Sequence, residues 1–132
     1  MNLTLDIGNT TTRLAIFNND EIIKHELIDT LSLTFLRKFL SINSNIKNLC
    51  FANTGSRIDY IESLCQEFQI RCIKINNKYN LPIIRDYKTP KTLGEDRLAL
   101  AIGANIKYPG DNLIIDLGTC ITYDIVLNNT HL

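Results

Sequence analysis

The sequence predicts an α/β fold with one nearly complete unit and the first hairpin of a second. Three observations lead to it. Apolar residues alternate in short runs near both ends of the chain, apolar residues recur at helical spacing between those runs, and the two ends resemble each other. With 132 residues, the chain is long enough to bury the core of one domain and short for a two-domain enzyme.

The N-terminal part is predicted to begin with three antiparallel strands. Residues 3–7 and 14–16 alternate on either side of a Gly-Asn turn, and residues 21–27 form a third alternating run. Apolar residues at helical spacing then predict a helix over 31–40, and a short buried strand follows over 49–52.

The same two patterns continue toward the C-terminus. They predict helices over 58–68 and 94–107 and strands over 70–75, 113–117 and 121–127. A long polar connection that carries two of the three prolines precedes the second of these helices. The predicted order is therefore β-β-β-α-β-α-β-α, followed by a hairpin.

Composition excludes several classes of protein. Hydrophobic residues make up 45% and charged residues 21%, as in ordinary globular proteins, so the chain is not expected to be disordered. Fourteen basic residues balance fourteen acidic ones, which argues against a nucleic-acid binder or a protein of anionic membranes. Without a long apolar run or a leader pattern at the N-terminus, we expect a cytoplasmic protein.

Cysteine usage fits the same compartment. The four cysteines form no CxxC pair and have only two histidines to join them, so reduced thiols are expected and a structural metal site is not.

The C-terminal hairpin repeats the N-terminal one. At an offset of 110 without gaps, both carry a D-x-G-x-x-x-T pattern. The matched residues are Asp6 with Asp116, Gly8 with Gly118, and Thr12 with Thr122. A duplication would give a first domain over 1–110 and the opening hairpin of an incomplete second domain over 111–132, hence a truncated chain of marginal solubility. The alternative is one small domain whose sheet the last hairpin completes.

The first hairpin turn has the chemistry of a phosphate site. A tight turn at Gly8 exposes successive backbone N–H groups, which can hold phosphate oxygens. Side chains there add further donors: Asn9, Thr10, Thr11, Thr12 and Arg13. Asp6 could hold Mg²⁺ through water. An ordinary hairpin turn is the alternative, and the chain has neither GxxxxGK[ST] nor GxGxxG.

The segment 87–97 is the second candidate site. Asp96 and Arg97 begin a predicted helix beside Gly94, where backbone N–H groups can bind an anion and a carboxylate can reach outward. The alternative is a plain helix start in which Thr92 or Asp96 is the cap and Arg97 is paired at the surface.

These motifs in combination resemble type III pantothenate kinase. The resemblance rests on DIGNTTTR at 6–13, YxxPxxLGxDR at 87–97 and IIDLGTxxTYD at 114–124, and it covers nearly the whole chain. It implies the actin-like ATPase (ribonuclease H-like) fold of the acetate and sugar kinase superfamily. It also implies transfer of the ATP γ-phosphoryl group to the primary hydroxyl of pantothenate, the first step of coenzyme A biosynthesis, with Mg²⁺, a monovalent cation (K⁺ or NH₄⁺) and a homodimer.

The resemblance assigns roles residue by residue. ATP would be bound by Asp6, Ile7, Gly8, Asn9, Thr10, Thr11, Thr12, Arg13 and Thr119. Pantothenate would be bound by Tyr87, Gly94, Glu95, Asp96 and Arg97. Asp96 matches the proton acceptor of the reaction, and Asp116 matches a ligand of the monovalent cation.

Some features depart from the family pattern. Arg13 stands where the family usually has lysine, and the turn over 53–57 is assigned no role. Much of the second domain would lie beyond Leu132, so this chain is expected to be weakly active or inactive. The alternatives are a non-catalytic accessory or regulatory binding protein of the same family, or another actin-like ATPase.

Overall fold

The computed structural model describes residues 1–55, 58–76, 81–89, 92–118 and 120–132. It is mixed α/β, as predicted, and divides into two compact units, Met1–Lys74 and Ile75–Leu132. The sequence predicted a division at residue 110. The structural division comes earlier because the helix before residue 110 contacts the C-terminal hairpin. The domains over 1–110 and 111–132 stay a prediction. Within the described ranges, no helix has the length and apolar character needed to cross a membrane.

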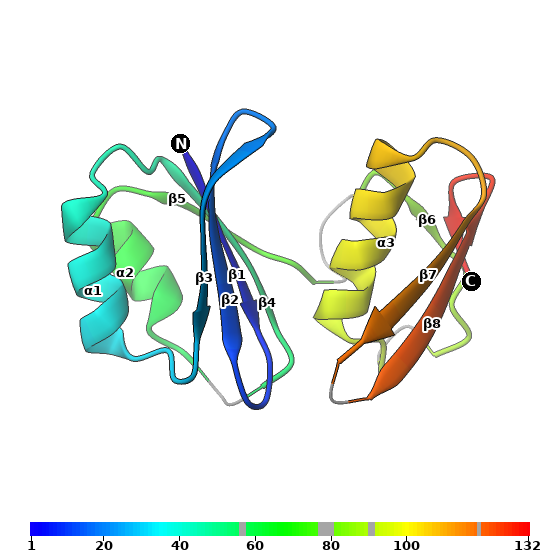
Figure 1. Ribbon diagram of the computed structural model, residues 1–132, viewed down its shortest axis with the longest axis horizontal. Coiled ribbons are helices and arrows are strands. Elements are labelled where there is room, and N and C mark those ends of the chain that lie inside the picture. The colour runs from blue at the N-terminus through cyan, green and yellow to red at the C-terminus, as the bar shows by residue number, and fades with distance from the viewer. Residues whose placement is uncertain (56–57, 77–80, 90–91, 119) are drawn as a thin grey trace. The chain divides into compact units, whose positions relative to one another are not determined.

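The first unit is a five-stranded sheet with two helices on one face (Figure 1). Its strands are β1 (Asn2–Ile7), β2 (Thr12–Asn18), β3 (Glu21–Ile28), β4 (Asn48–Asn53) and β5 (Arg71–Lys74), in the order β3-β2-β1-β4-β5. The first three strands are antiparallel, whereas β4 runs parallel to β1 and β5 parallel to β4. The helices are α1 (Leu33–Ile42) and α2 (Ile61–Glu67).

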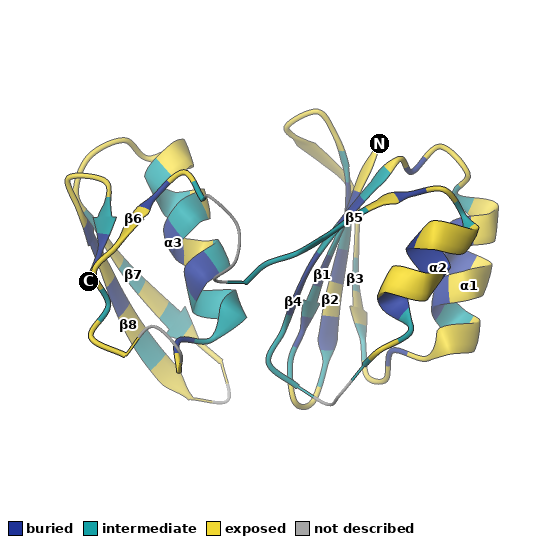
Figure 2. Ribbon diagram, turned by 180° about the vertical axis from the view of Figure 1, so that it is seen from behind, coloured by how far each residue is buried: buried dark blue, intermediate teal, exposed yellow. Residues whose placement is uncertain are grey.

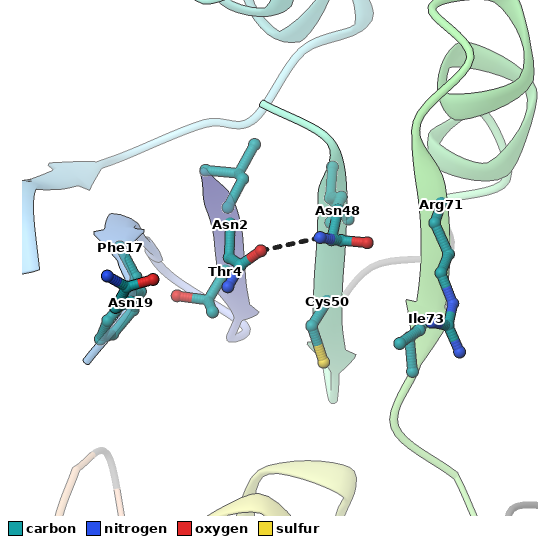
Figure 3. Close-up of a pocket in the computed structure, with 10 residues that line it drawn as sticks. Asn2, Thr4, Phe17, Asn19, Asn48, Cys50, Arg71 and Ile73 are labelled. Atoms are coloured by element: carbon teal, nitrogen blue, oxygen red, sulfur yellow. Dashed lines mark hydrogen bonds between the residues drawn. The ribbon is translucent and has the colours of Figure 1, made fainter. Parts of the chain in front are cut away.

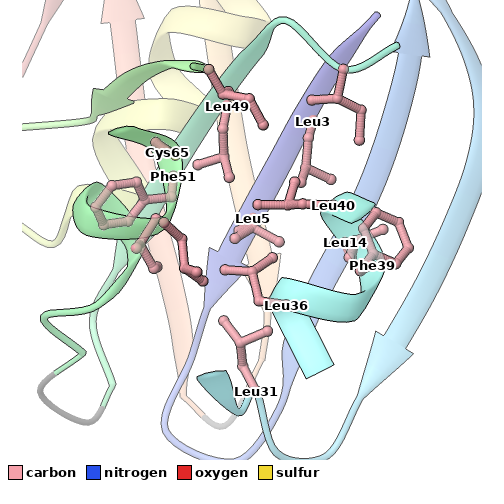
Figure 4. Close-up of a cluster of buried hydrophobic side chains, with 14 of the residues drawn as sticks. Leu3, Leu5, Leu14, Leu31, Leu36, Phe39, Leu40, Leu49, Phe51 and Cys65 are labelled. Atoms are coloured by element: carbon pink, nitrogen blue, oxygen red, sulfur yellow. The ribbon is translucent and has the colours of Figure 1, made fainter. Parts of the chain in front are cut away.

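The core of this unit fills the space between the sheet and the two helices (Figure 4). Leu3, Leu5 and Ile7 point toward the helices and are at most 2% exposed. Helix α1 begins where the Ser32 hydroxyl accepts a hydrogen bond from the Phe35 N–H (3.1 Å), which satisfies one of the free donors of the first turn. Alternation in the strands and helical spacing in α1 therefore bury one continuous apolar layer.

The second unit is a four-stranded sheet with one helix. It contains β6 (Ile84–Arg85), α3 (Glu95–Lys107), β7 (Asn112–Leu117), β8 (Ile121–Leu127) and β9 (Thr130–His131). The sheet order is β6-β9-β8-β7, and α3 contacts β7 and β8. The core comprises Ile83, Leu93, Leu98, Ala101 and Val126.

Strands β6 and β9 were not predicted. Each has only two residues, and β6 falls in the segment expected to be a polar connection. The link from β8 to β9 is a two-residue turn with positive φ at Asn128 (48°) and Asn129 (61°), the conformation that asparagine tolerates in tight hairpins. This turn brings His131 back beside β8.

Exposed and more buried residues alternate along the β7–β8 hairpin (Figure 2), and the exposed set forms an apolar face. We call it the open apolar face. Its six side chains are 42–75% exposed and stand opposite one another in three cross-strand pairs: Leu113 with Ile125, Ile115 with Tyr123, and Leu117 with Ile121. Alternate residues of β8, such as Val126, are buried instead.

Strand register corrects the gapless alignment of the two hairpins. Four residues separate β1 from β2, from Gly8 to Thr11, whereas three separate β7 from β8. Consequently Thr12 lies opposite Ile7, and the matching position opposite Leu117 is Ile121. The offset of 110 is wrong beyond the turn, because one extra turn residue moves every following side chain to the other face.

Candidate functional site

The turn between β1 and β2 is closed by its own backbone. The Gly8 N–H donates to the Thr11 carbonyl (3.0 Å). Asp6 and Arg13 stand opposite each other on the face that the helices do not cover, and the Arg13 Nη1 donates to the Asp6 Oδ2 (3.1 Å). Both side chains are exposed, at 42% for Asp6 and 57% for Arg13, so this ion pair contributes only about 0–1 kcal/mol to stability. Its charges are accessible to a ligand.

The loop after β4 supports this turn through backbone hydrogen bonds. The Thr54 and Gly55 N–H groups both donate to the Ile7 carbonyl (3.0 and 3.2 Å), and Gly55 also donates to the Asn53 Oδ1 (3.1 Å). A Cβ at Gly55 would lie 2.1 Å from the Gly8 carbonyl oxygen, so only glycine fits there. Sequence reasoning gave the turn over 53–57 no role. A glycine just after a buried strand was the available signal.

The predicted ATP-binding residues fall on two faces of the hairpin. Those at the turn and on its uncovered side are Asp6, Gly8, Asn9, Thr10, Thr11 and Arg13. Ile7 and Thr12 are 2% and 3% exposed and lie on the helix-covered side, so the structure does not bring the Thr12 side chain to Asp6. Thr119 lies outside the described residues. All these roles stay predictions.

Helix α3 begins at Glu95, and Gly94 is its N-cap, without a side-chain capping bond. The predicted caps Thr92 and Asp96 do not have that position: the Thr92 hydroxyl donates to the Thr89 carbonyl (3.0 Å), and Asp96 lies in the first turn. The Asp96 Oδ1 accepts from the Arg97 N–H (2.8 Å) and the side chain is half-buried. A carboxylate is favourable at this helix end because the free N–H groups carry partial positive charge.

Arg97 is held by a buried carboxylate. Its Nε and Nη2 donate to the two oxygens of Asp124 (2.9 and 2.8 Å), and Nη2 also donates to the Tyr123 carbonyl (3.0 Å). Its Nη1 donates to the Tyr87 hydroxyl (3.0 Å), and the guanidinium carbon lies 5.2 Å from the centre of that ring. The hydrogen bonds to Asp124 raise the pKa of Arg97 above its ordinary value.

Sequence reasoning assigned no role to two residues of this cluster, Asp124, which ends the IIDLGTxxTYD motif, and His131. The Asp124 side chain is 1% exposed, and the Asp124 Oδ1 is 2.7 Å from the Nε2 of His131, a fully buried histidine. A carboxylate at a buried position of an alternating strand was the signal for Asp124, because such a group needs partners. His131 gave no signal. The structure thus brings together the predicted residues Tyr87 and Arg97 and adds two more.

Asp116 faces a hydroxyl across the β7–β8 hairpin. It lies opposite Thr122, whose Oγ1 is buried and has no hydrogen-bond partner in the described part of the chain. A carboxylate beside an unpaired hydroxyl is a pair of oxygen donors suited to a hard cation. No group of three or more His, Cys, Asp or Glu side chains is close enough to hold a metal among the described residues.

A hollow of about 480 Å³ lies on the uncovered face of the first sheet (Figure 3). It is bordered by Asn2, Asn48 and Arg71, the first residues of three strands, and the Asn48 amide donates to the Asn2 Oδ1 (2.8 Å). Asp6 and its cross-strand partner Arg13 lie at the opposite end of β1, and none of the predicted site residues lines this hollow.

Comparison with known proteins finds a family model and relatives with the same description. A family model described as type III pantothenate kinase matches residues 2–132. A type III pantothenate kinase from Phocaeicola vulgatus is 36% identical over 127 residues, which are 96% of this chain and 52% of that protein. The one from Flavobacterium johnsoniae is 35% identical over 131 residues, 98% of this chain and 53% of the relative. The chain spans about half the length of the curated relatives it matches.

A solved structure has the same fold. It is the crystal structure of a conserved Campylobacter jejuni protein, described as a candidate transcriptional activator of the Baf family. It matches with a TM-score of 0.53 and 22% identity, over 98% of this chain and 51% of that one.

Proposed function

The chain belongs to the type III pantothenate kinase family, and we propose that it carries residues for transfer of the ATP γ-phosphoryl group to the primary hydroxyl of pantothenate. The observation that carries this proposal is the family match over residues 2–132. Because the chain spans about half of each relative, the activity of this chain by itself is part of the proposal.

Asp96 is the proposed proton acceptor. Its half-buried carboxylate at the start of α3 would orient the attacking hydroxyl and take its proton late. Phosphoryl transfer needs mainly positioning and neutralisation of charge, because its transition state is loose. Tyr87, Gly94, Glu95 and Arg97 would hold pantothenate around this carboxylate.

The β1–β2 turn is the proposed site of the ATP phosphates. Its backbone N–H groups and the exposed guanidinium of Arg13 would bind phosphate oxygens. The exposed Asp6 carboxylate fits a Mg²⁺ ion held through water, and that ion would supply positive charge to the phosphates.

Asp116 is the proposed ligand of a monovalent cation. The two hairpins explain why Asp116 and not Asp6 would have this role: Asp6 faces the cation of Arg13, whereas Asp116 faces the neutral and unpaired hydroxyl of Thr122. Among the described residues Asp116 forms no ion pair, so it suits a directly bound cation, whereas Asp6, already paired with Arg13, suits a cation held through water.

The wider properties of the family belong to the same proposal. They are a duplicated actin-like ATPase fold with domains over 1–110 and 111–132, a homodimer, and a cytoplasmic location. The balanced charge of the chain supports a small-molecule kinase over a nucleic-acid or membrane binder. A non-catalytic accessory or regulatory binding protein of the same family is the second candidate.

A coupled assay of ADP release tests the proposal. It would compare this chain with a chimera in which the unmatched part of the Phocaeicola vulgatus relative is joined to it, with and without pantothenate and K⁺. We expect pantothenate-dependent turnover in the chimera. Asp96→Asn should abolish turnover and leave pantothenate binding measurable by calorimetry. Hydrolysis that ignores pantothenate would point to another ATPase, and binding without turnover in the unsubstituted chimera to an accessory protein.

A further inference from the structure

The buried carboxylate of Asp124 joins four elements of the second unit. It pairs with Arg97 from α3 and with His131 from β9, while Tyr87, just after β6, accepts a hydrogen bond from the same guanidinium. A carboxylate that is 1% exposed costs much free energy unless it is paired and hydrogen-bonded. Here both of its oxygens have donors.

The carboxylate that accepts from His131 fixes the tautomer of its ring. A carboxylate only accepts hydrogen bonds, so the Nε2 of His131 carries the proton and donates it to Asp124 (2.7 Å). The opposite nitrogen, Nδ1, is buried and has no partner in the part of the chain that the structure describes. His131 therefore contributes one donor to Asp124, and the centre of its ring lies 5.8 Å from the centre of the Tyr87 ring.

The result is an arginine with little freedom. A guanidinium has five N–H groups. Four of those on Arg97 have acceptors among the described residues, so one N–H of Nη1 is left over. The Tyr87 hydroxyl accepts from Nη1 and keeps its own proton for donation. The cluster thus offers two donors on neighbouring atoms, one N–H of the Arg97 Nη1 and the Tyr87 O–H.

We propose that His131, through Asp124, is a positioning residue that orients Arg97 and Tyr87 for the acceptor substrate. This inference rests on the proposed function, since it assumes that these two side chains bind pantothenate. It also gives the unpredicted strands a purpose: β6 and β9 pair, and the Asp86 N–H donates to the His131 carbonyl (2.9 Å), which sets His131 beside Tyr87.

The first test needs no substrate. Nitrogen-15 NMR of the ligand-free chain would measure how fast the Arg97 Nε–H exchanges with water. We expect His131→Phe, which keeps a ring and removes the donor, to speed exchange about tenfold, in line with loss of one hydrogen bond to a charged group. His131→Gln keeps a donor and should stay within about threefold of the unsubstituted chain. Asn112→Ala is the matched control, because it removes exposed hydrogen bonds of the same unit, to the Tyr108 and Gly110 carbonyls, without touching Arg97 or the β8–β9 turn.

Several results would overturn the proposal. If His131→Phe and His131→Gln both leave the exchange of Arg97 unchanged, His131 is only a core residue. Equally faster Arg97 Nε–H exchange in both variants would also overturn the proposal, because the donor kept by glutamine would then have no effect. If His131→Phe does not fold, Asp124→Asn replaces it: the amide keeps the shape and disrupts the paired geometry, and an unchanged Arg97 signal in that variant would overturn the proposal.

The second test adds pantothenate. Calorimetry should show about tenfold weaker pantothenate binding for His131→Phe, because this variant lacks the donor to Asp124. Binding should be close to normal for His131→Gln, because glutamine keeps a donor. Failure of the unsubstituted chain to bind pantothenate would overturn the assignment of substrate to Arg97 and Tyr87. The ligand-free exchange rates would still decide whether His131 positions Arg97, so the two failures are distinguishable.

Discussion

The β1–β2 and β7–β8 hairpins begin with the same apolar alternation and are packed differently. Leu3 and Leu5 are at most 2% exposed beneath the helices of the first unit, whereas Leu113 and Ile115 are 65% and 51% exposed. Strand β1 is paired on both sides, by β2 and β4, and β7 pairs only with β8 among the described strands. Alternation thus specifies which side chains share a face, and the covering of that face depends on elements elsewhere.

The two hairpins also differ in how they use a carboxylate. Asp6 is paired with Arg13 at the surface, where solvent screens the interaction, while Asp124 is paired with Arg97 in the interior. The first pair can open for a ligand at little cost. The second acts as a fixed support.

The strongest test of the comparison places a charge on each apolar face. Leu5→Asp should cost more than about 4 kcal/mol and unfold the first unit, because an unpaired carboxylate would be buried. Ile115→Asp on the open apolar face should cost less than about 1 kcal/mol. Urea unfolding followed by circular dichroism measures both. Similar losses would mean that the open apolar face is covered in solution.

A second test removes one carboxylate from each ion pair. Asp124→Ala should destabilise the second unit by about 3–5 kcal/mol, since Arg97 and His131 lose their shared partner. Asp6→Ala should change stability by about 0–1 kcal/mol. The same urea titrations, repeated at high salt, provide the check: only the exposed pair should weaken with salt. A large loss of stability for Asp6→Ala would contradict the description of Asp6–Arg13 as a solvent-exposed ion pair.

The smallest expected effect distinguishes the β1–β2 turn, which the loop containing Gly55 supports, from the β7–β8 turn, which contains Gly118. Gly55→Ala should destabilise the first unit by about 1–3 kcal/mol, because the new methyl group would press on the Gly8 backbone. At Gly118 the nearest atoms to an added Cβ are 3.6 Å away or more, an ordinary contact, so Gly118→Ala should cost about 0.5 kcal/mol or less. Thermal melts of the two variants measure both losses of stability. A larger loss for Gly118→Ala would mean that the β7–β8 turn is the more tightly supported one.

Sequence predicted the longer elements well because they depend on local patterns. Helix α1 was expected over 31–40 and spans Leu33–Ile42, and both hairpins lie where alternation indicated. Strands β6 and β9 could not be predicted, because two residues carry no periodicity and their pairing joins segments more than forty residues apart.

The candidate site was predictable only in part, for a related reason. Tyr87 and Arg97 were identified by their motif, and the structure joins them. Their partner His131 depends on a turn at Asn128 and Asn129 that returns the chain to β8, and no local signal predicts which side chain will then meet a buried carboxylate. The side of the hairpin on which Thr12 lies followed from turn length and not from the shared D-x-G-x-x-x-T pattern.

The open apolar face also sets how molecules of this chain act on one another. With fourteen charges of each sign, the chain has no net charge near pH 7, so no long-range repulsion opposes the approach of two copies. Six exposed apolar side chains then make the pair potential attractive, and the second virial coefficient of the solution should be negative. Moving the pH well away from 6.7, the isoelectric point of the sequence, restores repulsion and with it colloidal stability.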